Sequence, residues 1–285
     1  MQVEDVMAPS ESLLDEIDAL LMRAYESGSR RSGVKRYLAV ENAGWVLVRA
    51  GERVVGVGGY IGYPTGGFGW IGLVATDPDV ARRGYGRVVT RALVDRLAAL
   101  GCGSVLDGSA KGAPLYEGMG FVDHGRSRLY LAPTGIVRAR AVPPGVRSST
   151  IGEIGLNGVA AYDAVAFGAD RSSLLGFLSD TYVGRSVVIC GVDGRVVGYG
   201  IAQDRAIGPV VADNDRTGEL IVDSLRRLPW EGPPSVIVPP ESSFSPALES
   251  MGFVLQRSLH RQHLGIGTLP GRRELLRAQT GFGEG

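Results

Sequence analysis

The sequence predicts an α/β protein of two domains in which one fold is used twice. Its 285 residues are enough for two domains of ordinary size. Two segments recur in the same order along the chain: GERVVGVG at 51–58 is similar to DGRVVGYG at 193–200, and YEGMGF at 116–121 is similar to LESMGF at 248–253. Self-similarity of this kind is typical of a duplicated unit, although hairpins and helix ends also recur by chance.

Each recurring segment predicts a local structure. The first pair combines a tight turn that contains glycine with an apolar run, which is typical of a β-hairpin. In the second pair, a short helix is expected to end near the methionine, with glycine at a position of positive φ and a strand starting at the phenylalanine. Prolines and glycines predict a linker near 133–145. We therefore expect domains over residues 1–135 and 140–285.

The composition excludes several functional classes. Lys and Arg together number 30, as do Asp and Glu, so no net charge attracts nucleic acid or an anionic membrane. The two cysteines suggest no disulfide framework, and we expect two buried thiols in a reducing cytoplasm. No apolar run reaches the roughly 18 residues of a membrane span, and the N-terminus lacks the pattern of a signal peptide. We expect a cytoplasmic protein with no nucleic-acid or membrane partner, and the oligomeric state is left open.

A strand, a basic loop and an amphipathic helix follow one another in the N-terminal copy. Residues 68–77 are expected to form the strand, and apolar residues between 88 and 100 recur at helical spacing. The first N–H groups of a helix lack internal partners and carry partial positive charge. Glycines let the preceding N–H groups converge on an anion, and arginines add charge. The pattern predicts a pyrophosphate-binding loop formed by Arg82, Arg83, Gly84, Tyr85, Gly86 and Arg87.

Two other interpretations of this loop stay open. A dinucleotide-binding loop needs a third glycine and an acidic residue about 20 residues further on. Val89 stands where that glycine should be, and Asp107 lies slightly too far along, so the sequence disfavours this interpretation. The second interpretation is that the loop is an exposed basic helix start that binds no ligand.

Two motifs resemble those of the GNAT acetyltransferases. The segments LVATDP at 73–78 and RGYG at 83–86 are similar to the family's acetyl-CoA signature, a Val-x-x-x-Pro turn followed by a [Gln/Arg]-x-x-Gly-x-[Gly/Ala] loop. The segment APLYEGMGF at 113–121 resembles the family's tyrosine-bearing helix and Gly-Phe turn. The chain departs from the pattern at Ala81, where the family has Gln or Arg, and at 111–112, where it lacks an asparagine.

The resemblance implies an acetyl-CoA-dependent N-acetyltransferase that acts by direct transfer on a primary amine, with no metal. The neutral charge balance and an expected enclosed pocket favour a small-molecule amine. The resemblance also implies a mixed, mostly antiparallel sheet flanked by helices in each domain. Tyr116 would lie near the sulfur and act as the acid for the leaving thiolate, and residues 82–87 would hold the pyrophosphate. Backbone groups for the pantetheine arm would come from Leu73, Val74 and Ala75. A catalytically inactive CoA-binding sensor or interaction module is the alternative.

The general base is not predicted. Asp77, Glu26 and His124 are candidates, but each is expected to be a surface or capping residue. His260 and His263 alternate with Arg261 in the expected final strand, without the spacing or the third ligand of a metal site.

The second copy differs at the position of the phosphate loop. A strand at 206–212 leads to a helix that begins near Asp213, Asn214 and Asp215, with no arginine-glycine loop. Acidic residues suit a helix N-terminus but would repel a pyrophosphate. This half resembles the C-terminal GNAT-like domains of two-domain bacterial acetyltransferases. We expect it to shape the acceptor pocket without binding CoA, with dimerisation or a structural role as the alternative.

Overall fold

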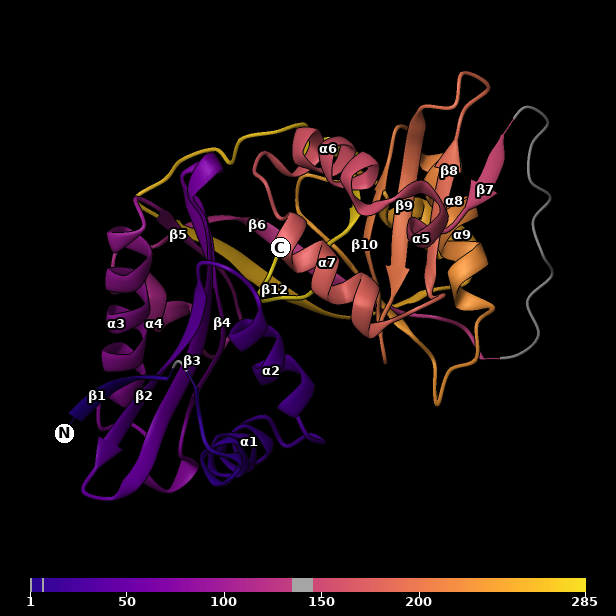
Figure 1. The fold of residues 1–285 in the computed structure, drawn as a ribbon. Helices are drawn as coiled ribbons and strands as arrows, with labels where there is room; N and C mark the ends of the chain where they lie inside the picture. Colours follow the sequence, from indigo (N-terminus) through magenta and orange to yellow (C-terminus); the bar gives the residue numbers. More distant parts are fainter. Residues whose placement is uncertain (1, 7, 135–145) are drawn as a thin grey trace. The chain divides into compact units, whose positions relative to one another are not determined.

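The computed structural model describes residues 2–6, 8–134 and 146–285. These residues form two compact units that interleave along the chain (Figure 1). Unit 1 consists of Met1–His124, His260–Gly267 and Glu284, and unit 2 of Gly125–Leu259, Thr268–Gly283 and Gly285. Most of the linker predicted near 133–145 lies outside the described residues.

The sheet of unit 1 is mixed and mostly antiparallel, as predicted. Four successive strands pair antiparallel in chain order: β1 (Gln2–Val6), β2 (Ala43–Ala50), β3 (Arg53–Tyr63) and β4 (Phe68–Thr76). The next strand, β5 (Gly103–Gly108), runs parallel to β4. Beside β5 lies the end of β12 (Val254–Leu264), which reaches unit 1 from the second sequence copy and pairs antiparallel with β5.

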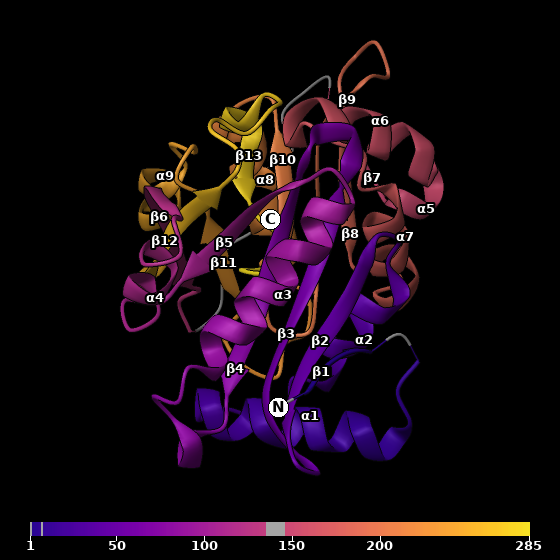
Figure 2. The same ribbon diagram turned by 90° about the vertical axis from the view of Figure 1, so that its left-hand side faces the viewer.

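Helices cover both faces of this sheet. They are α1 (Glu11–Tyr25), α2 (Arg31–Ala39), α3 (Tyr85–Ala99) and α4 (Ala113–Glu117). Figure 2 shows α3 lying in front of the strands of unit 1. Glycines in β3 allow the helices to approach closely, because a Cβ at Gly58 would meet Leu93 of α3 at 2.7 Å and one at Gly59 would meet Tyr37 of α2 at 2.9 Å. Neighbouring residues of β3 therefore face the two opposite helix layers.

Unit 2 repeats the same plan. Its antiparallel sheet has the order β7 (Arg147–Ser149), β8 (Ser186–Cys190), β9 (Val196–Ala202), β10 (Ile207–Ala212) and β13 (Leu276–Ala278). In addition, β11 (Ser235–Val238) pairs antiparallel with β6 (Val122–Leu131), and the other neighbour of β6 is β12. Its helices are α5 (Ile151–Ile154), α6 (Leu156–Phe167), α7 (Ser172–Thr181), α8 (Asp215–Arg226) and α9 (Ser245–Ser250).

Hydrogen bonds confirm the predicted duplication. In unit 1, the N–H of Phe121 donates to the carbonyl of Tyr116 at 3.1 Å, and in unit 2 the N–H of Phe253 donates to Leu248 at 3.0 Å. The intervening glycines, Gly120 and Gly252, have φ of 95° and 84°. Both hairpins also form as predicted, between β2 and β3 and between β8 and β9.

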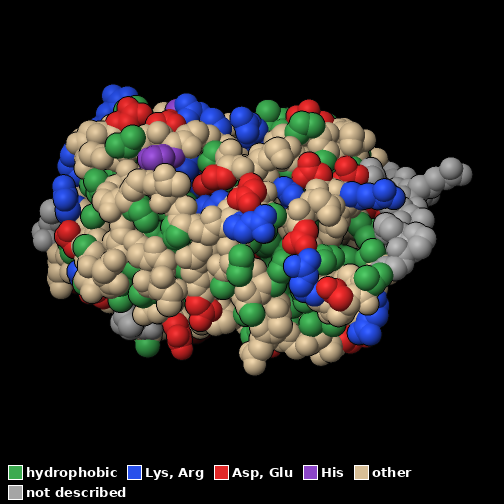
Figure 3. Space-filling model, turned by 90° about the horizontal axis from the view of Figure 1, so that it is seen from above, with side chains coloured by type: hydrophobic (Ala, Val, Ile, Leu, Met, Phe, Trp, Pro, Cys, Tyr) green, Lys and Arg blue, Asp and Glu red, His purple; other side chains and the backbone are tan. Residues whose placement is uncertain are grey.

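The surface carries charges of both signs. On the face drawn in Figure 3, Lys and Arg side chains alternate with Asp and Glu and no large patch has a single sign. Cys102 and Cys190 are both buried and free, as predicted. Within the described ranges, no helix combines the length and apolarity that a membrane crossing requires.

We predict that Gly69→Ala lowers the free energy of unfolding by about 1 to 3 kcal/mol, because overpacking a tight contact forces strain. The added methyl would meet Leu97 of α3 and would lie 2.8 Å from the carbonyl oxygen of Ile61, and a backbone atom cannot rotate away. Urea unfolding measures the change. Gly28→Ala is the control, because no atom lies within 4 Å of its Cβ position. Equal stability of the two variants would contradict the account of this packing.

Candidate active site

The strands β4 and β5 separate halfway along their length. They pair only from Phe68 with Gly103 to Ile71 with Leu106, and the described remainder of β4 pairs with β3 alone. A bulge lies at the point of separation, where Leu73 and Val74 of β4 face the single residue Gly58 of β3. An extra residue bends a strand away from its neighbour. The sheet therefore opens between the carboxyl ends of β4 and β5.

The backbone at this bulge is unusual. Leu73 has a φ of 51°, a left-handed conformation that side chains other than glycine seldom adopt. Such conformations are concentrated at functional sites, where the surrounding structure enforces them. Of the three residues predicted to face the pantetheine arm, Leu73 and Val74 are half-buried and Ala75 is buried. The carbonyl of Val74 already accepts a hydrogen bond of 2.9 Å from the hydroxyl of Tyr25, at the end of α1.

The predicted phosphate loop leads from this edge into α3. Arg82 and Gly84 have positive φ, of 65° and 84°. No side chain caps the start of α3, and its first turn holds no acidic residue. The N–H groups of Gly84, Tyr85 and Gly86 donate to no residue in the part of the chain that the structure describes. Three unpaired N–H groups thus lie together at a positive helix end, which is a suitable site for an anion.

Three arginines surround these N–H groups in the sequence, and all three are exposed. Arg87 donates to the carbonyl of Gly118 at 3.1 Å, which ties α3 to the end of α4. Arg82 and Arg83 make no hydrogen bond or ion pair within the described residues. Ala81, the position where the sequence departs from the family signature, is also exposed and its methyl group offers no donor.

A buried carboxylate fixes the turn between β4 and this loop. Asp77 is fully buried and accepts hydrogen bonds from the N–H of Asp79 at 3.1 Å and from Nε of Arg53 at 2.9 Å. Burial raises its pKa, but the Asp79 N–H and the Arg53 guanidinium outweigh burial, and the net pKa is lowered. Asp77 therefore stays ionised and acts as a cap, not a base. Unit 2 repeats the arrangement with Arg195 and Asp213, 3.5 Å apart.

The tyrosine of α4 is packed tightly near the end of β5. Tyr116 stands against Gly108 and Gly112, where a Cβ would lie 3.1 to 3.2 Å from its ring, and Phe121 meets the ring edge-on at 5.9 Å between centroids. Burial raises the pKa of Tyr116 to about 12. Its hydroxyl makes no hydrogen bond to any described residue. Tyr116 thus keeps its proton at neutral pH and has it available for a ligand.

The structure also brings together polar residues that the sequence analysis did not connect. Asp107, near the end of β5, pairs with Arg261 of β12 through an Nε–Oδ1 contact of 2.8 Å, and both side chains are fully buried. The Arg261 guanidinium stacks 4.8 Å from the ring of Trp70. His260 contacts Asp123 through an Nδ1–Oδ2 distance of 2.9 Å. No sequence signal connects these pairs, because their members lie more than 130 residues apart.

The remaining candidate bases are not placed for catalysis. Glu26 is exposed and forms the left-handed end of α1. His124 is exposed, and its ring stacks on that of His263 with 3.9 Å between centroids. Nδ1 of His263 contacts the carbonyl of Gly267 at 2.8 Å. Among described residues, no group of three or more His, Cys, Asp or Glu side chains is arranged to hold a metal ion.

In unit 2, the chain itself fills the corresponding opening. Ala206, just before β10, forms one parallel bridge with Ser235, the first residue of β11, and β4 and β5 are likewise parallel at their start. Beyond it, β13 pairs with β10, and the N–H of Gln279 donates to Ile237 of β11 at 2.9 Å. The extended segment 276–279 thus contacts both strands of the opening.

The start of α8 is closed as well. The side chain of Asn214 caps it by accepting from the N–H of Thr217 at 2.9 Å. Arg277 forms an ion pair with Asp215 at 3.2 Å, so a guanidinium of the chain already compensates the acidic first turn. The capped and acidic helix start predicted for the second copy is confirmed.

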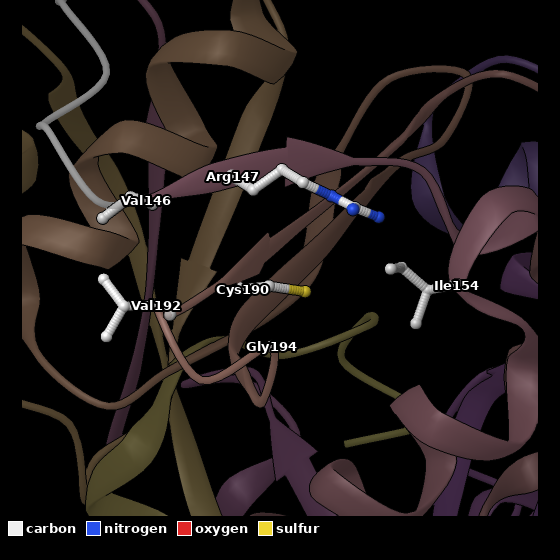
Figure 4. A pocket seen from close by; sticks show the side chains of 7 residues that line it. Val146, Arg147, Ile154, Cys190, Val192 and Gly194 are labelled. Atoms are coloured by element: carbon white, nitrogen blue, oxygen red, sulfur yellow. The ribbon is translucent and has the colours of Figure 1, made fainter.

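A cavity of about 450 Å³ lies elsewhere in unit 2. It is lined by Val146, Arg147, Ile154, Cys190, Gly191, Val192 and Gly194. Arg147 extends from β7 toward Ile154 across this space (Figure 4). Its lining offers one guanidinium and one thiol but neither a carboxylate nor an imidazole, so the acid–base groups described above do not meet there.

Comparisons with known proteins agree with this geometry. Residues 14–121 match the family model described as Acetyltransferase (GNAT) family, and residues 159–276 match the one described as Acetyltransferase (GNAT) domain. No curated protein matches the chain.

Several solved structures share the fold. A candidate acetyltransferase from Pyrococcus horikoshii is 24% identical, with a TM-score of 0.82 over 99% of this chain and 96% of that chain. A tandem GNAT protein from the clavulanic acid biosynthesis pathway is 16% identical, with a TM-score of 0.66 over 94% and 99%. A GCN5-related N-acetyltransferase from Sphaerobacter thermophilus is 17% identical, with a TM-score of 0.66 over 94% and 96%.

The two family matches together span most of the chain, and they coincide with the two copies that the sequence and the hydrogen bonds define. The chain therefore belongs to the GNAT family of acetyltransferases, with one GNAT domain in each half, and it is an acyltransferase.

Proposed function

We propose that unit 1 is the catalytic unit and transfers the acetyl group of acetyl-CoA directly to the primary amine of a small molecule in the cytoplasm. The observation that carries this proposal is the opening between β4 and β5 next to the uncapped start of α3. An extended ligand with peptide groups can pair with such a free strand edge. A pyrophosphate fits the adjacent helix start.

The opening has two parts, and each suits one part of CoA: the strand edge suits the pantetheine arm, and the helix start suits the pyrophosphate. Backbone groups of Leu73, Val74 and Ala75 would face the pantetheine arm, with Tyr25 releasing or sharing the Val74 carbonyl, which has two lone pairs. The N–H groups of 84–86 and the side chains of Arg82 and Arg83 would hold the pyrophosphate. Acetyl-CoA, when bound, supplies the acetyl group as an activated thioester.

Unit 2 supports the proposal by contrast. Its equivalent opening holds the chain's own extended segment 276–279, so this fold accommodates an extended chain at that position. Because this opening and the start of α8 are filled from within, we propose that unit 2 binds no CoA. Its role in shaping the acceptor pocket stays a prediction from the sequence.

The class of acceptor is proposed from the charge of the chain. Lys and Arg number 30, as do Asp and Glu, so no net negative charge attracts a basic protein tail, which favours a small-molecule amine. Acetyl-CoA binding without turnover for any amine would support the inactive sensor instead.

We predict that Tyr116→Phe lowers kcat by about 10² to 10⁴-fold, the usual contribution of a positioned proton donor. The dissociation constant of acetyl-CoA should change little, because the ring and its packing against Gly108 remain. Free-thiol release measures kcat, and isothermal titration measures binding. With a pKa of about 12, Tyr116 keeps its proton up to about pH 11, so its ionisation should not reduce kcat below that pH. An unchanged kcat would remove the proposed role.

We predict that Arg83→Ala weakens acetyl-CoA binding by about tenfold, because a charge-assisted hydrogen bond contributes about 1.5 kcal/mol. The matched control is Arg216→Ala, an exposed arginine in the first turn of α8, and it should leave the affinity unchanged. Isothermal titration of the full chain measures both. The opposite pattern, with loss only in Arg216→Ala, would place the cofactor in unit 2.

A further inference from the structure

We infer that His260, oriented by Asp123, is the general base that removes the proton from the acceptor amine. This inference rests on the function proposed above for unit 1. The two side chains form an Nδ1–Oδ2 contact of 2.9 Å, and they are 24% and 36% exposed. The imidazole is thus fixed by a carboxylate and still accessible to a ligand.

The register of the sheet brings His260 to the open end of β5. His260 of β12 pairs with Gly108, the last residue of β5, two residues beyond the point where β5 parts from β4. Gly108 has no side chain, and a Cβ there would lie 3.1 Å from the ring of Tyr116 and 3.0 Å from Oε1 of Gln262. The face of the sheet at Gly108 is therefore the face that carries α4 and its tyrosine.

His260 lies on this same face. Alternate residues of a strand share a face, and Gln262, two residues along β12, donates to the carbonyl of Ala113 in α4 at 3.4 Å. His260 is directly opposite Gly108, the residue against which the ring of Tyr116 packs. The proton donor proposed for the sulfur and the His260–Asp123 pair thus occupy one end of one face.

The hydrogen bond sets the chemistry of the ring. A carboxylate only accepts, so Nδ1 of His260 donates to Asp123, and the neutral ring then has its lone pair on Nε2. Nε2 of His260 contacts no hydrogen-bonding partner in the portion of the chain that is described. A base held by a third group in this way is the arrangement that activates nucleophiles in many transferases and hydrolases.

Two buried carboxylates and the two other histidines of unit 1 contact other partners. Asp77 is held by Arg53, and Asp107 is held by Arg261. His263 is buried, bonds Gly267 through Nδ1 and stacks on His124. His260 therefore combines an orienting carboxylate with an accessible accepting nitrogen.

With His260 as the base and Tyr116 as the acid, every proton of the transfer reaction is accounted for. As the amine nitrogen forms its bond to the acetyl carbon, Nε2 of His260 takes the proton that the nitrogen loses. As the bond between the acetyl carbon and sulfur breaks, the Tyr116 hydroxyl gives its proton to the thiolate. His260 returns its proton to solvent and Tyr116 recovers one, so that amine and thioester yield amide and thiol.

The test uses the full chain with acetyl-CoA and spermidine, glucosamine or lysine as amine probes. His260→Ala should lower kcat by about 10² to 10⁴-fold, with an unchanged dissociation constant for acetyl-CoA, and added imidazole should restore part of the rate. Asp123→Asn should also lower kcat, because it removes the group that fixes the tautomer. His124→Gln is the matched control, an exposed histidine whose ring only stacks, and its kcat should stay at the wild-type value.

Wild-type kcat in His260→Ala would overturn the inference, as would a loss of kcat in His260→Ala that imidazole does not reverse while the thermal midpoint is unchanged. If His260→Ala fails to fold, Asp123→Asn carries the test, and wild-type kcat there overturns the inference. A wild-type chain that binds acetyl-CoA but releases no thiol with any probe refutes the proposed function itself, and the inference with it.

Discussion

The carboxyl end of β4 must satisfy its backbone polar groups without a neighbouring strand on the β5 side. Pairing between β4 and β5 ends at Ile71 and Leu106, and the bulge at Leu73 and Val74 turns the strand away. Buried backbone groups need partners, and an open strand edge pairs readily with an extended chain. The hydroxyl of Tyr25 supplies one such partner, to the carbonyl of Val74.

The two halves of the chain meet the same requirement differently. In unit 1, a tyrosine hydroxyl reaches the Val74 carbonyl, and the helix start beside it is left uncapped. In unit 2, β13 pairs with β10, and Asn214 caps the next helix. The duplicated frame, including the Arg53–Asp77 and Arg195–Asp213 pairs, is kept in both. The halves therefore share their folding constraints and differ in what completes the opening.

Local features of the fold could be predicted from the sequence because they depend on residues close together in the chain. The hairpins, the Met-Gly-Phe turns and the uncapped start of α3 each follow from a few neighbouring residues. The resemblance to the GNAT family identified the fold, and the fold class is confirmed. The placement of Tyr116 near the sulfur and of residues 82–87 at the pyrophosphate stays a prediction.

The features that could not be predicted from the sequence depend on pairing between segments that lie far apart in the chain. Nothing in residues 254–264 indicates that they pair with β5 of the other copy, because an amphipathic strand fits either sheet equally well. For that reason the Asp107–Arg261 and His260–Asp123 pairs could not be predicted. The bulge could not be predicted from the sequence either, because Leu73 has a left-handed conformation that its side chain does not favour.

Hydrogen exchange of the full chain with and without CoA tests the central claim most directly. If the opening in unit 1 is the cofactor site, CoA slows exchange of the amides of 73–75 and 84–86 and leaves those of 210–211 and 215–218 unchanged. Protection of the segments in unit 2, or no protection at the edge of β4, would contradict the account.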